Sequence, residues 1–412
     1  MSYLFNNQVG FVGNAVDGFN RLKVSQPFTL FDSQHRYQIN DKWDTFGVTG
    51  GTATYEVLES AVLLSVGTTA GSKITRETKR VFAYQPGKSL LILNTFAMNQ
   101  PKDGLLQRVG YFGISGGATF GVPANGIYVQ QDGLTLSLCL ASQSLNTITK
   151  VEQSSWNGDK FDGTGASGRT LDISKTNIFW TDIEWLGVGS VRCGFVIDGQ
   201  LIHCHSFHHA GIEDDVYMTT AALPIRYEIK NTAGTASNST LKQICSTVIS
   251  EGGFSPTGRP RSYGLDLNQQ RTLTTIATFY PVVSLRLNPA YPDSIVVPTD
   301  IGLLPVSTGL YKYKLVKGGT FTGDVWANTS SDSVVQYQSN TSATFTGGED
   351  LHTGFISSTV QAGGSVDFRD GLFKFQLERD SLANTYTPFT LLVACDTATS
   401  NVVASMDWEE IT

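Results

Sequence analysis

The sequence predicts an all-β protein in which an extended N-terminal arm is followed by two β-sandwich domains of the jelly-roll type. Short apolar runs of strand length recur along the chain and are broken by glycine and polar turns. The 42 glycines and a charged fraction of 16% are typical of a turn-rich fold. No helical apolar period extends beyond about three turns. With 412 residues, the chain is long enough to form more than one domain core.

The three segments follow from the order of these patterns. Residues 1–40 mix glycine, asparagine and aromatic residues without a stable period, which predicts the extended arm. Residues 41–285 contain strand-length runs such as "SLLILNTFAM", which predicts a large sandwich. Residues 286–412 contain the proline-bearing "NPAYPDSIVVPTD" near their start and then further strand-length apolar runs such as "PFTLLVAC". We therefore expect a second, C-terminal sandwich there.

The strongest local signal is a hairpin in "VRCGFVIDGQLIHCH". Asp198 and Gly199 lie between alternating apolar runs and predict a two-residue turn with positive φ. The resulting register places Cys193 opposite Cys204 on the core face, as a hydrogen-bonded pair of the wider kind. We expect two buried thiols rather than a disulfide. The five cysteines include no Cys-x-x-Cys pair, which favours a reducing compartment.

A glycine pattern, Gly163-x-Gly165-x-x-Gly168, has the spacing of a dinucleotide-binding loop. That fold requires a strand directly before the glycines and a helix opening at them. Here a turn precedes them, and a turn and a strand follow. The sequence predicts a flexible loop between strands and no cofactor. The neighbouring Asp159 and Asp162 lack the ligand alternation of a calcium loop.

Charge and hydropathy exclude two classes of partner. The formal net charge is −7, and the basic residues of "KITRETKR" (residues 73–80) are typical of a solvated edge strand, so we expect no nucleic-acid partner. No apolar run approaches the roughly 20 residues of a membrane helix. The N-terminus also lacks the basic-then-apolar order of a secretory signal. We expect neither membrane insertion nor export by that route.

Four of the six histidines lie between positions 203 and 209. His203 and His205 alternate along a predicted strand, which places two imidazoles on one side, as in metal-binding β-barrels. The arrangement is similar to the cupin pattern, which also requires a glutamate four or five residues after the second histidine. His209 and Ala210 occupy those positions. His203, His205 and His209 are therefore candidate metal ligands. The alternative is a polar strand end at a subunit contact.

A candidate carbohydrate site lies in "WTDIEWLG". This stretch is similar to the active-site strand of family 16 β-glucanases, whose pattern is Glu-x-Asp-x-Glu. Asp182 and Glu184 match, but Trp180 occupies the nucleophile position and has no lone pair to attack an anomeric carbon. We therefore expect no enzymatic activity. A strand face with Trp180, Asp182 and Glu184 suits the stacking and hydrogen bonding of a sugar. The alternative places Trp180 in the core.

The N-terminal region carries the pattern Asp-x-Phe-x-Arg-Leu-x-Val-Ser-x-Pro-x-Thr-Leu-Phe-Asp. Eleven positions carry it: Asp17, Phe19, Arg21, Leu22, Val24, Ser25, Pro27, Thr29, Leu30, Phe31 and Asp32. The stretch resembles a sequence near the start of tailed-phage virion structural proteins, where it precedes β domains. Residues 182–207 and 223–229 are also similar to stretches of those proteins.

The resemblance implies a structural component of a tailed-bacteriophage virion, associated with tail, fibre or neck and assembled in the host cytoplasm. Its partners would be other virion proteins and copies of itself in a homo-oligomer. An alternative is a host-adsorption protein that binds a surface glycan through the Trp180, Asp182 and Glu184 face. An extended arm suits assembly because it can add to a neighbour's sheet. The expected anchoring residues are Phe19, Arg21, Leu22, Val24, Pro27, Leu30 and Phe31.

Overall fold

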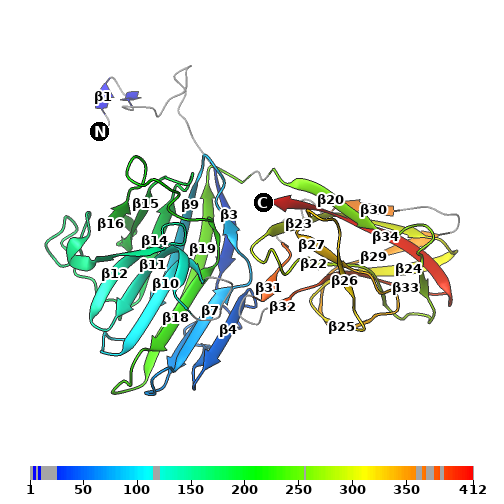
Figure 1. Ribbon diagram of the computed structural model, residues 1–412, viewed down its shortest axis with the longest axis horizontal. Helices are drawn as coiled ribbons and strands as arrows, with labels where there is room; N and C mark the ends of the chain where they lie inside the picture. The colour runs from blue at the N-terminus through cyan, green and yellow to red at the C-terminus, as the bar shows by residue number, and fades with distance from the viewer. Residues whose placement is uncertain are drawn as a thin grey trace.

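The computed structural model describes residues 3–5, 8–10, 26–114, 121–254, 257–358, 364–367, 375–380 and 385–411. The chain forms antiparallel β-sheets in two lobes that lie side by side (Figure 1). Within the described ranges, the only helical element is the 3-10 turn η2 (Gln153–Ser155). None of these residues belongs to a helix long and apolar enough to cross a membrane. The prediction of an all-β fold is confirmed.

Two sheets pack face to face in the N-terminal lobe. In spatial order, the seven-stranded sheet contains β13 (Thr147–Glu152), β12 (Thr135–Ser142), β11 (Pro123–Asp132), β10 (Leu105–Ile114), β18 (Ile225–Asn231), β7 (Lys73–Thr78) and β4 (Trp43–Val48). The eight-stranded sheet contains β16 (Gln200–Phe207), β15 (Val191–Ile197), β14 (Asn177–Ile183), β9 (Ser89–Ala97), β19 (Ser239–Glu251), β6 (Ala61–Val66) and β5 (Thr52–Glu56), with β3 (Pro27–Ser33) also paired to β19. The inward-facing residues of both sheets form one core cluster, from Phe31 to Val248.

The C-terminal lobe is a second sandwich. Its five-stranded sheet contains β20 (Arg259–Gly264), β34 (Ser400–Ile411), β23 (Ile295–Pro305) and β30 (Gly364–Asp367), with β21 (Arg271–Leu273) paired to β34. Its six-stranded sheet contains β26 (Trp326–Asn328), β27 (Val335–Gln338), β22 (Tyr280–Leu287), β33 (Phe389–Cys395), β24 (Gly309–Lys317) and β29 (Glu349–Ser358). A separate core cluster, from Leu273 to Trp408, lies between them.

Four two-stranded ribbons complete the described strands. They are β1 (Tyr3–Phe5) with β2 (Gln8–Gly10), β8 (Phe82–Ala83) with β17 (Ala222–Leu223), β25 (Thr320–Thr322) with β28 (Thr344–Thr346), and β31 (Arg379–Asp380) with β32 (Thr385–Tyr386).

The division between the two groups of sheets lies between Glu251 and Arg259. Strands β20 and β21 pair with β34, and β22 pairs with β27 and β33. The junction predicted at residue 285 therefore lies inside the second group. Of the prolines that suggested it, Pro289 and Pro292 lie in the turn between β22 and β23, and Pro298 lies within β23.

Part of the segment predicted as an arm (residues 1–40) belongs to the first sandwich. Strand β3 pairs with β19. Phe31 is 4% exposed, and its ring lies 5.8 Å from that of Trp43 and 4.9 Å from that of Phe82. Burial of this apolar ring stabilises the packing of residues 27–33 against the sheet. Of the predicted anchoring residues, Pro27 is exposed and Leu30 packs against the core, whereas Phe19, Arg21, Leu22 and Val24 lie outside the described residues.

The basic segment of residues 73–80 is not a solvated edge strand. Strand β7 lies between β18 and β4 inside the seven-stranded sheet. Arg76 is 1% exposed and donates hydrogen bonds to Thr45 Oγ1 (2.6 Å) and to the carbonyl of Asn40 (3.1 Å). Its guanidinium lies 5.7 Å from the Trp43 ring. Arg76 is therefore a core residue, held by two hydrogen bonds and a cation–π contact, while its buried Nε has no hydrogen-bond partner among the described residues.

Apolar and charged contacts join the two lobes. Val81 forms a small buried cluster with Ile295 and Val297. Next to it, Arg80 Nε lies 3.0 Å from Glu378 Oε1. Both partners are largely buried, so this ion pair links the end of β7 to the C-terminal lobe under partial exclusion of water.

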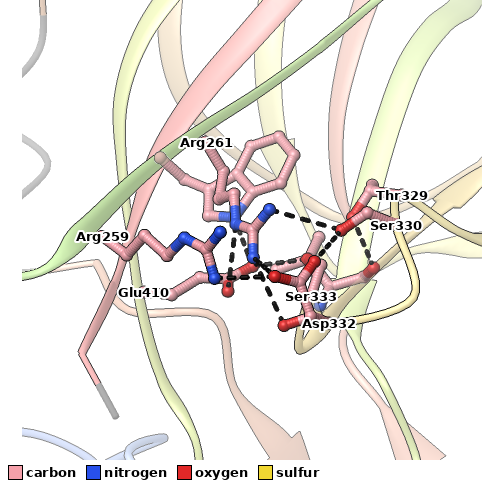
Figure 2. Close-up of polar contacts among 9 residues, drawn as sticks. Arg259, Arg261, Thr329, Ser330, Asp332, Ser333 and Glu410 are labelled. Atoms are coloured by element: carbon pink, nitrogen blue, oxygen red, sulfur yellow. Dashed lines mark hydrogen bonds and ion pairs between the residues drawn. The ribbon is translucent and has the colours of Figure 1, made fainter.

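A polar network ties the loop between β26 and β27 to the five-stranded sheet (Figure 2). Arg259 Nη1 and Arg261 Nη2 lie 2.7 and 2.9 Å from Asp332 Oδ2. Glu410 accepts hydrogen bonds from Ser333 and from the indole of Trp408. The hydrogen bonds from Arg261 and from Ser330 and Arg259 lower the pKa of Asp332. These groups satisfy one another, which identifies the network as a structural tether.

Candidate ligand-binding groove

An open groove of about 620 Å³ crosses the outer face of the eight-stranded sheet, the face turned away from the core. Five adjacent strands, from β19 to β16, contribute its walls and floor. The lining residues are Ser89, Leu91, Trp180, Asp182, Arg192, Leu201, His203, Ser206 and Glu251. Because residues directly opposite each other in an antiparallel sheet point to the same side, the strand register explains how they come together.

The first row across the groove is charged. Asp182 lies opposite Arg192, which in turn lies opposite Ser206. The carboxylate of Asp182 and the guanidinium of Arg192 form an ion pair, and 56% of the Arg192 side chain is exposed. Asp182 Oδ1 is buried and accepts no hydrogen bond from the described residues. The row therefore offers an accessible guanidinium and a carboxylate whose hydrogen-bonding capacity is only partly used.

The second row is aromatic. Trp180 lies opposite Gly194, and Gly194 lies opposite His203. A Cβ atom on Gly194 would lie 2.9 Å from Trp180 Nε1 and 1.9 Å from the carbonyl oxygen of Ile202. The missing side chain lets the indole reach across β15, where Nε1 donates a hydrogen bond to that carbonyl (3.3 Å). Trp180 is 6% exposed and forms part of the groove floor.

His203 is a neutral member of the groove. Burial, with a smaller contribution from the nearby Arg192, lowers the pKa of His203 below its ordinary value. Its Nε2 forms a hydrogen bond of 2.7 Å with Ser206 Oγ. The groove thus combines a guanidinium, the carboxylates of Asp182 and Glu251, a neutral imidazole and hydroxyl groups. Such a set donates and accepts hydrogen bonds in many directions.

The structure brings two of the three predicted sugar-binding residues together. Trp180 and Asp182 both line the groove, whereas Glu184 does not. Strand β14 ends at Ile183, and the Glu184 amide donates to the carbonyl of Ser190 (3.0 Å). The chain turns at this point, so the period of two that would align Glu184 with Asp182 ends.

The predicted hairpin is present, with one correction to its register. Asp198 and Gly199 form the turn with φ of 50° and 76°, as expected. A β-bulge then changes the pairing, so that Cys193 lies opposite His205 and Cys204 is the extra residue. The predicted pairing of Cys193 with Cys204 is therefore wrong. Both thiols are free and buried, as predicted, and burial raises their pKa values.

The same bulge separates the candidate metal ligands. His203 faces the groove, whereas His205 is 8% exposed and its Nδ1 accepts a hydrogen bond from the Asn157 amide (3.2 Å). His209 stacks on Tyr217 at a centroid distance of 4.0 Å. In the part of the chain that the structure describes, no three His, Cys, Asp or Glu side chains are grouped to hold a metal ion. The expectation that His203 and His205 share one side of the strand fails because the bulge interrupts the period.

The glycine pattern belongs to a loop that closes around Asp159. Asp159 accepts hydrogen bonds from the amides of Phe161 (2.9 Å) and Ser167 (2.6 Å). A Cβ on Gly165 would lie 2.3 Å from Asp159 Oδ1, which explains the glycine there. The next regular element is strand β14, as predicted for a loop between strands. Within the described residues the glycines open no helix.

The start of this loop borders the groove. The amides of Gly158 and Asp159 donate to the carbonyls of Cys204 (2.7 Å) and His203 (2.9 Å). The Asn157 side chain adds two hydrogen bonds to the Ser206 backbone. Residues 157–159 therefore extend the hydrogen bonding of β16, the outermost strand of the sheet, and fix the strand that carries His203.

Some groove residues had a sequence signal and others did not. Arg192, Leu201 and His203 fall on the outer face of the predicted hairpin. Glu251 had no local signal, because it joins the groove only through the pairing of β19 with β9 across more than 150 positions of sequence. Long-range pairing of this kind is not readable from a local pattern.

No protein-family model matches the chain, and no curated protein matches it. Among solved structures, the CBM2 module of the evolved Dit of Lactobacillus casei BL23 phage J-1 aligns with 57% of this chain and 100% of that module, at 6% identity and a TM-score of 0.38. Peanut lectin aligns with 56% of this chain and 100% of its own, at 11% identity and a TM-score of 0.34. Bacillus licheniformis β-glucanase aligns with 55% of this chain and 99% of its own, at 12% identity and a TM-score of 0.35. Values this low indicate nothing about the activity of this chain.

Proposed function

We propose that this chain is a carbohydrate-binding component of a tailed-phage particle, and that the groove on the eight-stranded sheet is its glycan site. The observation that supports the site is the convergence of Trp180, Asp182 and Arg192 on one solvent-open groove. The particle assignment rests on the N-terminal resemblance. Contacts with other virion proteins and with copies of the chain belong to the same proposal.

The chemistry of the groove suits an oligosaccharide. Sugars present apolar C–H faces and hydroxyls that both donate and accept, so their sites combine apolar surface with charged hydrogen-bonding groups. Leu91 and Leu201 supply most of the apolar surface above the largely buried Trp180, and Asp182 and Arg192 supply the polar groups. Five adjacent strands span four interstrand spacings, about 19 Å, which is more than a single sugar ring needs.

The proposal is one of binding without cleavage. Trp180 occupies the position of the nucleophile in the resemblance to family 16 β-glucanases, and Asp182 is engaged by Arg192. Retaining hydrolysis requires two carboxyl groups about 5 Å apart that can act as nucleophile and acid. We expect that glycans bound by the protein release no new reducing ends during prolonged incubation.

The test is a glycan array probed with the full chain and two arginine variants. Arg192→Ala removes the exposed guanidinium of the groove, and we expect binding to fall about tenfold or more, the loss of a charged hydrogen bond. Arg169→Ala is the matched control, because this exposed arginine pairs with Asp198 away from the groove. Absence of any glycan ligand, or equal binding by Arg192→Ala and wild type, would contradict the proposed site.

Imaging of intact particles tests the rest of the proposal. We expect the chain at a tail tip or fibre with Arg192 and Leu201 facing solvent. If a neighbouring protein covers the groove, the chain has an architectural role and the glycan site is excluded.

A further inference from the structure

A second pocket, of about 450 Å³, lies in the C-terminal lobe, far in sequence from the groove. It lies where the two sheets of that sandwich meet at an open side, between the β20–β21 region on one sheet and β22 with β27 on the other. Leu265 and Val282 supply apolar lining. The rings of Tyr263 and Tyr337 stack in its wall, with centroids 3.9 Å apart. The rest of the lining is mostly polar, which suits a hydroxylated ligand better than an apolar one.

Side-chain amides line the mouth of this pocket. They belong to Asn268, Gln269, Gln270, Gln338 and Asn340. Among the described residues, the side chains of Asn268 and Gln269 have no hydrogen-bond partner, and Gln338 uses its Nε2 on the carbonyl of Asn340 (2.9 Å). An amide both donates and accepts without carrying charge, which matches the hydroxyl groups of a saccharide.

One buried cation distinguishes the pocket. Arg271 is 7% exposed, its Nη2 donates to the carbonyl of Ala343 (3.3 Å), and its guanidinium lies 5.4 Å from the Tyr280 ring. Its Nε is buried without a hydrogen-bond partner, and no carboxylate in the described part of the chain lies within ion-pair distance. Burial lowers the pKa of Arg271. By contrast, the buried Arg226 pairs with Glu77.

A buried guanidinium without a carboxylate is unfavourable, and an incoming carboxylate would relieve that cost. We propose that this pocket binds an acidic saccharide, with its carboxylate at Arg271 and its hydroxyls at the surrounding amides. The site is independent of the groove on the N-terminal lobe and of the function assigned there. Together the two sites would give one chain two points of contact with glycans.

The experiment compares uronates with neutral hexoses on the full-length protein. Calorimetric titrations use D-glucuronate and D-galacturonate against D-glucose and D-galactose, which differ in the carboxylate. We expect at least one uronate to bind about tenfold more tightly than its hexose, since a charged hydrogen bond replaces a neutral one. Failure of both uronates to bind, or equal affinity of uronate and hexose, would overturn the proposal.

Variants assign the site. Arg271→Gln should abolish the preference for the uronate. Gln338→Ala at the mouth removes a neutral hydrogen bond but leaves the buried guanidinium in place. We expect it to weaken the binding of both sugars about fivefold. Arg286→Gln is the matched control, because Arg286 lies on β22 and contacts Gln336 and Trp326 outside the pocket. Arg192→Ala in the groove should leave uronate binding unchanged. An unaltered preference in Arg271→Gln, or loss of it in Arg192→Ala, would contradict the assignment.

Discussion

Two buried histidines show how the fold controls protonation at single residues. Burial, with the nearby Arg76 as a smaller cause, lowers the pKa of His35 to about 4. Burial, together with His203 and His208, lowers the pKa of His205 to about 4. Both imidazoles are used as acceptors, since His35 Nδ1 accepts from the Asn40 amide and His205 Nδ1 from the Asn157 amide. The folded protein therefore requires both in the neutral form.

A pH dependence of stability follows from these lowered pKa values. The unfolded chain takes up a proton at each histidine once the pH falls below about 6.5. In the folded protein the two histidines become protonated only near pH 4. Stability is therefore complete above pH 6.5 and is lost as the pH falls through this window. We expect a loss of about 2 kcal/mol per histidine between pH 7 and pH 5. Urea unfolding at the two pH values measures it.

The variant His35→Gln should lose about 2 kcal/mol less than wild type over the same interval, because it removes one titrating group. Gln34→Ser, at the exposed position next to His35, changes no titrating group; it is the control and should lose as much as wild type. An unchanged pH dependence in His35→Gln would exclude His35 as a source of the effect.

At the scale of the element, sequence patterns predicted turns better than strand register. The Asp198-Gly199 turn follows from residues that tolerate positive φ, a purely local property. The bulge at Cys204 depends on how β16 bonds to residues 157–159 and on the room that Gly194 leaves for Trp180, which are contacts between remote segments. Counting residues outward from the turn therefore could not predict the pairing of Cys193 or the orientation of His205.

The turn can be tested by a single methyl group. Gly199→Ala adds a Cβ that meets nothing within 4 Å, so its effect is confined to the backbone, which has φ of 76°. We expect a loss of about 1 kcal/mol in the free energy of unfolding. Gly67→Ala, also in open space but without a positive φ, should cost less or nothing. Equal effects of the two substitutions would contradict the assigned turn geometry.

At the scale of the whole molecule, composition and spacing predicted two sandwiches, but not where the first begins or where the second takes over. Phe31 is a core residue only because Trp43, Phe82 and the β19 strand surround it. Likewise, β20 to β22 belong to the C-terminal lobe because of partners as distant as β34. Strand-length patterns establish that strands form, whereas the choice of sheet depends on long-range pairing.

Two truncations separate the roles of the N-terminal residues. Removal of residues 1–25 should leave the melting temperature close to that of the full chain, because the described core residues begin at Phe31. Removal of residues 1–33 also takes away the Phe31 ring and the hydrogen bond from Trp43 Nε1 to Ser33 Oγ (2.7 Å). We expect this second truncation to lose about 3 kcal/mol or more. Thermal unfolding of both proteins measures the difference.

The same truncations test anchoring. If residues 1–25 bind the chain into a particle, the shorter truncation folds but is missing from purified particles. Normal incorporation of that protein would contradict an anchoring role for residues 1–25.

The hydrogen bonds from residues 157–159 to β16 affect how copies of the protein can associate at high local concentration. An unprotected outermost strand offers its backbone as a template on which a second molecule can polymerise. Because Gly158 and Asp159 already occupy the carbonyls of Cys204 and His203, copies held at high local concentration cannot fuse their sheets along those positions. The short segment that leads into the glycine pattern thus blocks sheet-to-sheet association at these positions of β16.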